Sequence, residues 1–270
     1  KERDFLERSW GEVQVIPDFE TTHRIGNDYH RINRDKMREF FLEELHKAEV
    51  LHNRESYIMY NTEYYPIDWP KVILPFNRGG MAHKKGFRRS DKLRKPNMFV
   101  THWDVCLNAA SCFRVLTRRG LSIHFTIDND GTIRQHLDIN HVALHAGSTK
   151  WNNASIGCEI SNAYYPKYQS WYVKNGFGER PIACAKVHGK KLDPFLQFYP
   201  VQLEALKALY KAVHEATGIP LATPRAQTTS ASCRSGKYKG FISHFHLTKG
   251  KIDCAGLNIN SILEEIKHEK

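Results

Sequence analysis

The sequence predicts an α/β fold in which a single central mixed β-sheet is flanked by helices and preceded by an N-terminal extension. Two observations carry this prediction. From Asn97 onward, short runs of β-branched and aromatic residues alternate with amphipathic helical patterns, an order typical of a sheet with helices packed on it. Before that point the alternation is missing. We therefore divide the chain into an extension, residues 1–92, and a domain, residues 93–270.

The extension carries one helical pattern and one cationic run. Over residues 35–50, DKMREFFLEELHKAEV, apolar residues recur at helical spacing. Residues 77–96, NRGGMAHKKGFRRSDKLRKP, combine glycine and proline with many lysines and arginines, which favours a linker or a solvated arm. Nothing in this region indicates catalysis. We expect it to hold an anionic surface or to cover part of a cleft.

The domain opens with three predicted elements in close succession. Residues 97–103, NMFVTHW, form a short apolar strand that runs into a histidine. Residues 107–120 predict a helix that ends at a glycine. Residues 122–137 predict a hairpin, because β-branched and aromatic residues flank an Asp-Gly pair that favours a turn with positive φ.

Three further elements complete the domain. Residues 154–161, ASIGCEIS, predict a buried strand. After a long irregular stretch, residues 200–218 give the clearest helical pattern, with Pro200 at its start and Gly218 at its end. A last helix is expected over about residues 259–268.

Composition restricts the partner. A formal charge of +11 favours an anionic partner, but no RNP, KH or zinc-finger pattern accompanies it, so we expect no nucleic acid. No apolar run approaches the roughly 18 residues that span a bilayer, so we expect no membrane span. Because the chain opens with Lys1 rather than Met, we expect any export signal to have been removed or never to have been present.

Candidate metal ligands occur at two distant places in the chain. A catalytic zinc site holds three protein ligands that lack a proton near neutral pH. His102 ends the first strand of the domain, and the segment SHFHLTKGKIDCAG offers His244, His246, Asp253 and Cys254. Taken singly, each histidine is more often a surface or core residue than a metal ligand. Their clustering with a cysteine puts a metal site on an equal footing with that alternative.

The strand 154–161 carries Glu159 among apolar residues. A carboxylate there is costly to bury unless it is paired or functional. Its neighbours at period two, Gly157 and Ser161, are small, so their shared face could line a cleft. Glu159 would then be a general base whose pKa is set by burial and a nearby cation. The alternative is an exposed glutamate at a sheet edge.

Several motifs in order resemble the type 2 N-acetylmuramoyl-L-alanine amidases, a superfamily that includes phage lysozyme-type amidases, anhydromuropeptide amidases and peptidoglycan recognition proteins. The resemblance covers about residues 93–268, and its most specific part is HAG followed by N-x-x-SIG-x-E. It implies one zinc ion and hydrolysis of the amide between N-acetylmuramic acid and L-alanine in peptidoglycan or muropeptides. The alternative is a peptidoglycan-binding recognition module without turnover.

The resemblance implies roles for individual residues. His102 and His244 match the two zinc histidines, and His246 falls where the family usually has an acidic residue, which suggests a supporting or surface position. Glu159 matches the catalytic glutamate of the anhydromuropeptide branch. Ile123 stands where the phage-type branch carries a catalytic tyrosine, so a tyrosine mechanism is not expected.

Three more residues receive roles in the same way, and Lys251 receives one from its charge and its position in the sequence. His145 of HAG, Asn152 and Asn162 are expected to contact the substrate. Lys251, close to the metal ligands in sequence, is expected to stabilise the oxyanion that forms during amide hydrolysis.

The third zinc ligand is open between two adjacent residues. Family members end the site as K-x-D-P-G or as x-x-C-P-G, and this chain reads KIDCAG. Cys254 keeps the glycine two residues on, and a thiolate is the softer zinc ligand. We therefore prefer Cys254 as the third ligand, with Asp253 as the alternative or as a hydrogen-bond acceptor beside the site.

Cys106 and Cys112 enclose five residues at the start of a predicted helix. A disulfide and two reduced thiols are both compatible with this spacing. The pair matches the spacing of a disulfide in peptidoglycan recognition proteins, and this resemblance favours an extracytoplasmic location, either periplasmic or secreted. Cys158, inside a predicted core strand, is expected to be an inert thiol.

Overall fold

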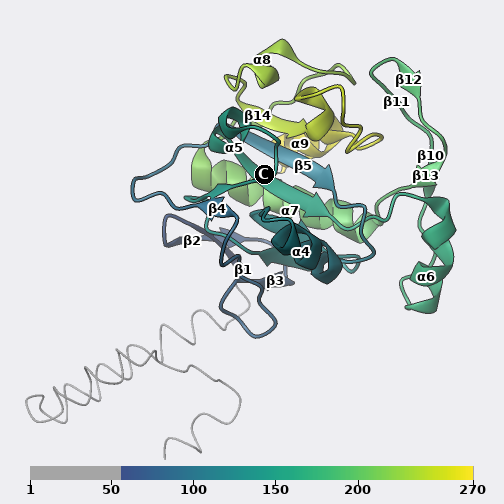
Figure 1. Ribbon diagram of the computed structural model, residues 1–270, viewed down its shortest axis with the longest axis horizontal. Helices are drawn as coiled ribbons and strands as arrows, with labels where there is room; N and C mark the ends of the chain where they lie inside the picture. The colour runs from purple at the N-terminus through teal and green to yellow at the C-terminus, as the bar shows by residue number, and fades with distance from the viewer. Residues whose placement is uncertain (1–55, 270) are drawn as a thin grey trace, which may run out of the picture. The chain divides into compact units, whose positions relative to one another are not determined.

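The computed structural model describes residues 56–269 (Figure 1). The chain divides into two compact units, Lys1–Asn53 and Arg54–Lys270, and only the second falls within the described residues. The helix expected over residues 35–50 lies outside them. Among the helices that the structure describes, none combines the length and the apolar composition needed to cross a bilayer.

A six-stranded mixed sheet forms the centre of the second unit. Its order is β14-β5-β9-β6-β7-β3. Neighbouring strands run parallel except β6 and β7, which form the antiparallel hairpin expected over residues 122–137. The fold class predicted from the sequence is confirmed. The strands span Val72–Ile73 (β3), Met98–Trp103 (β5), Phe125–Ile127 (β6), Ile133–Gln135 (β7), Ser155–Ile160 (β9) and Gly240–Ser243 (β14).

Helices lie on both faces of this sheet, as Figure 1 shows for α4 and α7. The long helix α7 begins at a proline and ends before Gly218, whose φ of 71° is the left-handed value that glycine adopts without strain. Its apolar side chains pack, together with α9, on the face that carries Phe99 and Phe241. The helices span Ala109–Arg118 (α4), Thr149–Ala154 (α5), Gln169–Lys174 (α6), Pro200–Thr217 (α7), Ala231–Arg234 (α8) and Ile259–His268 (α9), with short 3-10 turns at Pro166–Tyr168 (η1) and His244–His246 (η2).

The side chains of strand β9 alternate between the hydrophobic core and the opposite face of the sheet. Ile156, Cys158 and Ile160 are fully buried in the main hydrophobic cluster beneath α7, and Cys158 is therefore part of the core, as expected. Because side chains alternate along a strand, Gly157 and Glu159 face the opposite way. The face beneath α7 is thus mostly apolar, with the Thr101 hydroxyl hydrogen-bonded to that of Tyr210, and the opposite face can carry polar groups.

Residues 56–91 are built into the same compact unit as the rest of the domain, so the division expected at residue 92 does not coincide with a structural boundary. Strand β3 pairs with β7 of the central sheet, and the β1–β2 hairpin packs against α7. Strand β4 pairs with β8. These strands span Ser56–Tyr60 (β1), Glu63–Ile67 (β2), Phe87–Arg88 (β4) and Val142–Ala143 (β8).

The cationic run 77–96 is partly solvated but is not a free linker. Its side chains at Lys84, Lys85 and Arg89 are exposed. His83, in contrast, is buried and accepts a hydrogen bond from the backbone N–H of Ile123. The expectation of a separate solvated arm is therefore wrong for the parts of this run that contact the domain.

The long irregular stretch before α7 contains short paired strands and a buried cation. Arg180, only 2% exposed, donates to the backbone carbonyls of Ser161 and Gln197, and its guanidinium contacts the rings of both Tyr172 and Tyr199. It joins this stretch to the end of β9. The strands span Ile182–Ala183 (β10), Lys186–Val187 (β11), Lys190–Lys191 (β12) and Phe195–Leu196 (β13).

Candidate metal centre and active site

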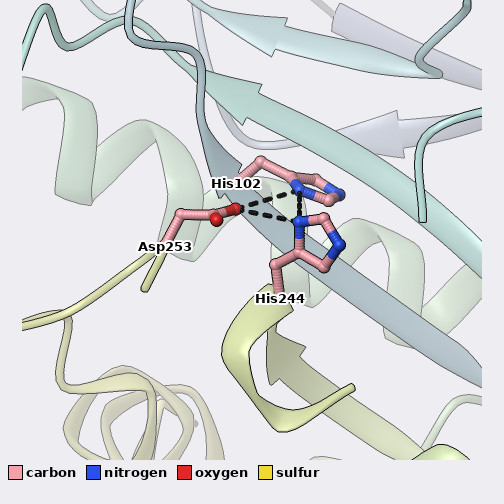
Figure 2. Close-up of side chains that lie close together, drawn as sticks. All are labelled: His102, His244 and Asp253. Atoms are coloured by element: carbon pink, nitrogen blue, oxygen red, sulfur yellow. Dashed lines mark hydrogen bonds and ion pairs between the residues drawn. The ribbon is translucent and has the colours of Figure 1, made fainter. Parts of the chain in front are cut away.

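Three side chains from separate parts of the chain converge at one edge of the sheet (Figure 2). The Nδ1 atoms of His102 and His244 lie 2.9 Å apart. Asp253 Oδ2 lies 3.2 Å from the first of these atoms and 3.1 Å from the second. All three residues are buried, with exposures of 2%, 4% and 6%. They form the one such group of potential metal ligands within residues 56–269.

The sheet topology explains why these residues meet. Strands β5 and β14 are parallel neighbours, and their register pairs Thr101 with Ser243. The residues that follow these partners, His102 and His244, therefore emerge side by side at the carboxyl edge. Asp253 returns to this edge because its backbone carbonyl accepts from the N–H of Phe245 at 3.0 Å.

The electrostatics of this group suit a metal ion. Burial, reinforced by the neighbouring His244, lowers the pKa of His102 to about 4, although Asp253 opposes the shift. Burial alone would raise the pKa of Asp253, but its close polar contacts with the rings of His102 and His244 outweigh that effect and hold the pKa well below its usual range. A neutral imidazole and an ionised carboxylate are the forms that bind metals.

The donor set and its spacing fit zinc. Two imidazole nitrogens and one carboxylate oxygen are ligands that Zn²⁺ accepts, and three protein ligands leave a position open. Zinc bonds of about 2.0–2.1 Å in a tetrahedron would separate the ligand atoms by roughly 3.3 Å. The three separations, 2.9, 3.1 and 3.2 Å, are close to that value.

Glu159 lies beside this group on the neighbouring strand. Strands β5 and β9 are parallel, and their register pairs His102 directly with Glu159. The Oε2 atom of Glu159 is buried and has no hydrogen-bond partner among the residues described. Burial, together with the Asp104 and Asp253 carboxylates, raises the pKa of Glu159 well above its usual range. Glu159 is therefore not the exposed edge glutamate of the alternative interpretation.

The family model for N-acetylmuramoyl-L-alanine amidase matches residues 92–253, more than half of the chain. The chain belongs to this amidase family. Its match begins just before β5 and ends at Asp253, so it spans all three members of the buried group and Glu159. The superfamily resemblance drawn from the sequence is thereby confirmed.

Individual proteins are similar over smaller parts or at low identity. A Rickettsia conorii protein that carries N-acetylmuramoyl-L-alanine amidase as a provisional name is 33% identical over 75 residues, which cover 25% of this chain and only 28% of that relative. The amidase LysC from Clostridium intestinale has a TM-score of 0.42 at 19% identity, and the match covers 74% of this chain and 96% of the LysC chain. Drosophila peptidoglycan recognition protein SA has a TM-score of 0.35 at 14% identity and covers 65% and 81%. The family assignment does not depend on these three.

Cys254, the residue preferred from the sequence as third ligand, lies outside the buried group. Its side chain is fully buried in the main hydrophobic cluster, on the side of the sheet covered by α7 and α9. Burial raises the pKa of its thiol well above the usual range, and the neighbouring Asp253 acts in the same direction. A neutral thiol in the core is a poor zinc ligand. The geometry favours the alternative, Asp253.

Two asparagines that we expected to contact the substrate have their side chains bonded within the protein. Asn152 Oδ1 accepts from the backbone N–H groups of His145 and Ala146, at 3.1 and 2.7 Å. Asn162 is fully buried and bonds backbone groups through both ends of its amide. Both residues support the backbone around the site, and this use of their polar atoms argues against direct substrate contact.

His145 was also expected to contact the substrate, and its two ring nitrogens are likewise engaged within the protein. Nδ1 lies 2.9 Å from His102 Nε2, and Nε2 lies 3.2 Å from the hydroxyl of Ser155. Burial lowers the pKa of His145 well below its usual range. Sequence reasoning missed Ser155. Its period-two spacing from Gly157 and Glu159 is the signal that could have placed it on the same face.

The remaining candidates fall in three different environments. His246 is buried, accepts from the N–H of Ser243 and contacts the carbonyl of Ala226, so it supports the turn after β14. Ile123 is fully buried. Lys251 is exposed, and its charge is a minor contribution that lowers the pKa of both His102 and Glu159. Its ammonium group is thus within electrostatic reach of the site.

Cys106 and Cys112 are free thiols. A hydrogen bond with Cys106, together with burial, raises the pKa of Cys112 well above its usual range. The two residues therefore lie in contact as thiols and not as the disulfide that the resemblance suggested. The extracytoplasmic location inferred from that disulfide stays a prediction.

Proposed function

We propose that this protein is a zinc-dependent amidase that hydrolyses the bond between N-acetylmuramic acid and L-alanine in peptidoglycan or muropeptides. Membership of the amidase family supports this reaction. The observation that carries the proposal is the convergence of His102, His244 and Asp253 directly beside Glu159. A metal-binding group and a proton-transfer group at one sheet edge are the parts that amide hydrolysis requires.

His102, His244 and Asp253 would hold the ion. When bound there, zinc supplies a Lewis acid that polarises the amide carbonyl and lowers the pKa of water to about 7. The protein supplies the remaining parts of the mechanism. Burial of the three ligands keeps bulk water away, which strengthens electrostatic interactions within the site.

Glu159 would transfer the proton. Its carboxylate takes a proton from the attacking water while the water oxygen bonds to the carbonyl carbon. It returns that proton to the nitrogen as the C–N bond breaks, which leaves a carboxylic acid on the lactyl group and a free amine on L-alanine. Burial raises the pKa of the Glu159 carboxyl group toward neutral pH. A group with a pKa near the working pH can serve first as a base and then as an acid.

Lys251 would stabilise the negative charge that develops on the carbonyl oxygen. It lies two residues before Asp253 and carries a positive charge within electrostatic reach of Glu159. A cation at that position stabilises the transition state more than the uncharged substrate. Lys249, in the same loop, has no role in this proposal.

The Glu159→Gln variant tests the catalytic part of the proposal. Glutamine keeps the shape of the side chain but cannot take up a proton, so we expect release of peptides from purified cell walls to fall by about 10²-fold or more. The zinc content, measured by elemental analysis, should stay at the wild-type level. Unchanged peptide release would remove Glu159 from the mechanism.

A pair of adjacent variants tests the metal ligands. Asp253→Asn should lower the zinc content of the purified protein, whereas Cys254→Ala should leave it unchanged because the thiol faces the core. The opposite result would make Cys254 the third ligand. If the wild-type protein bound cell walls and released no peptide from them, a recognition module without turnover would replace the enzyme.

A further inference from the structure

A chain of hydrogen bonds runs from the backbone to the metal ligand His102. The hydroxyl of Ser155 lies 2.7 Å from the backbone carbonyl of Trp151. The same hydroxyl oxygen lies 3.2 Å from His145 Nε2. At the far side of the ring, His145 Nδ1 lies 2.9 Å from His102 Nε2. His102 Nδ1, the remaining nitrogen, faces His244 and Asp253.

The hydrogen atoms in this chain can be assigned in order. A carbonyl oxygen only accepts, so the single hydroxyl hydrogen of Ser155 must point to Trp151. The hydroxyl oxygen then accepts, and the donor is the Nε2–H of His145. An uncharged imidazole carries one ring hydrogen, so Nδ1 of His145 has a lone pair and accepts from the Nε2–H of His102. Nδ1 of His102 is then left without a hydrogen.

We propose that His145 is a positioning residue that holds His102 in the tautomer whose Nδ1 lone pair is free for the metal ion. This inference rests on the proposed zinc site. It changes the role expected for His145 from a substrate contact to a support of a ligand. Partners of this kind fix both the tautomer and the orientation of a ligating imidazole, and their loss typically lowers metal affinity 10- to 100-fold.

Two features of the surrounding structure keep the His145 ring in place. A Cβ atom at Gly157 would lie 2.6 Å from Nδ1 of His145, so only glycine leaves room for the ring over β9. Asn152 fixes the backbone of the same segment by accepting from the N–H groups of His145 and Ala146. Gly157 and Asn152 thus act on His102 through His145.

The test compares His145→Leu with His145→Asn in the full chain. Leucine removes the acceptor, and we expect the affinity for zinc, measured by competition with a chromophoric chelator, to fall about 10- to 100-fold. Asparagine places Oδ1 near the position of Nδ1 and should restore most of that affinity. His214→Leu is the matched control: His214 contacts a backbone carbonyl from α7, away from the site, and its loss should leave zinc affinity unchanged.

The tautomer itself gives a second readout that does not need zinc. In the metal-free protein, ¹⁵N NMR of the His102 ring should show hydrogen on Nε2 and none on Nδ1, and His145→Leu should weaken that preference. Wild-type zinc affinity in His145→Leu, or a hydrogen on Nδ1 of His102 in the wild-type protein, would overturn this inference while leaving the amidase proposal intact. A wild-type protein that binds no zinc would instead overturn the proposed function, and this inference with it.

Discussion

Removal of residues 1–92 is predicted to abolish folding of the amidase domain, whereas removal of residues 1–53 is not. The longer deletion takes away β1, β2, β3 and β4, and with them one strand of the central sheet. The shorter deletion leaves the compact unit that begins at Arg54 complete. Comparison of the two deletions therefore tests which boundary is correct: residue 92, expected from the sequence, or residue 53, found in the structure.

The magnitude follows from three apolar side chains that the longer deletion removes from the core. Ile58, Ile67 and Leu74 are 0%, 4% and 8% exposed. Burial of such a side chain contributes about 1.5–3 kcal/mol, so the three together contribute roughly 5–9 kcal/mol. Because a domain is stable by only about 5–15 kcal/mol in total, their loss is comparable to the whole free energy of unfolding.

Thermal unfolding followed by circular dichroism measures the effect. At about 2–4 °C for each kcal/mol in a domain of this size, the chain starting at residue 93 should lose at least 10 °C or show no cooperative transition. The chain starting at residue 54 should unfold cooperatively at the temperature at which the domain unfolds in the full chain. A chain of residues 93–270 with that same midpoint would refute the reasoning.

Three further predictions concern stability. Burial lowers the pKa of His83 to about 4 and that of His136 to about 3, so the unfolded chain binds more protons than the folded one as pH falls below 6.5. Between pH 8 and pH 5 each histidine should remove about 2 kcal/mol, and urea midpoints that stay constant over this range would contradict the prediction. Arg180→Met removes one hydrogen-bond donor from four acceptors, of which the Ser161 carbonyl and Gln202 Oε1 keep another donor. The other two, Asn129 Oδ1 and the Gln197 carbonyl, should cost about 1–3 kcal/mol each, so we expect a loss of about 2–6 kcal/mol in urea unfolding; a loss below about 1 kcal/mol would show that the arginine is dispensable. Gly157→Ala forces a methyl group against His145 and should destabilise the fold by about 1–3 kcal/mol, measured in the same way, and wild-type stability would mean that the ring has room to move.

The elements with strong local periodicity were predictable from the sequence. The helix expected over residues 200–218 appears as Pro200–Thr217, and the last helix appears as Ile259–His268. Both have apolar residues at helical spacing over at least ten residues, so the pattern identifies the buried face without knowledge of its partner. The hairpin at residues 122–137 was recognised from its turn, where Gly131 has a φ of 79°.

The segments that escaped prediction owe their structure to distant partners. Strands β3 and β4 are two residues long, too short for any periodic pattern, and each forms only by pairing with a strand more than fifty residues away. The sequence did not separate the two candidate third ligands for a related reason. Asp253 and Cys254 are adjacent in sequence, but one faces the histidines and the other faces the core beneath α7. The preference of zinc for sulfur over oxygen does not show which of two adjacent residues faces the site. The direction of each side chain decides this, and the sequence does not show that direction.

Strand β9 shows how period two encodes much of this site. Ser155, Gly157 and Glu159 alternate with core residues and therefore share one face. The hydroxyl of Ser155 lies within hydrogen-bond distance of the His145 ring, Gly157 leaves space for that ring, and Glu159 lies in register with His102. A shift of one residue in the pairing of β9 would turn all three into the apolar core at once. The strand's register therefore couples the hydrogen-bond chain behind His102, the proposed metal ligand, to the carboxylate beside it, and the two must form together when the sheet folds.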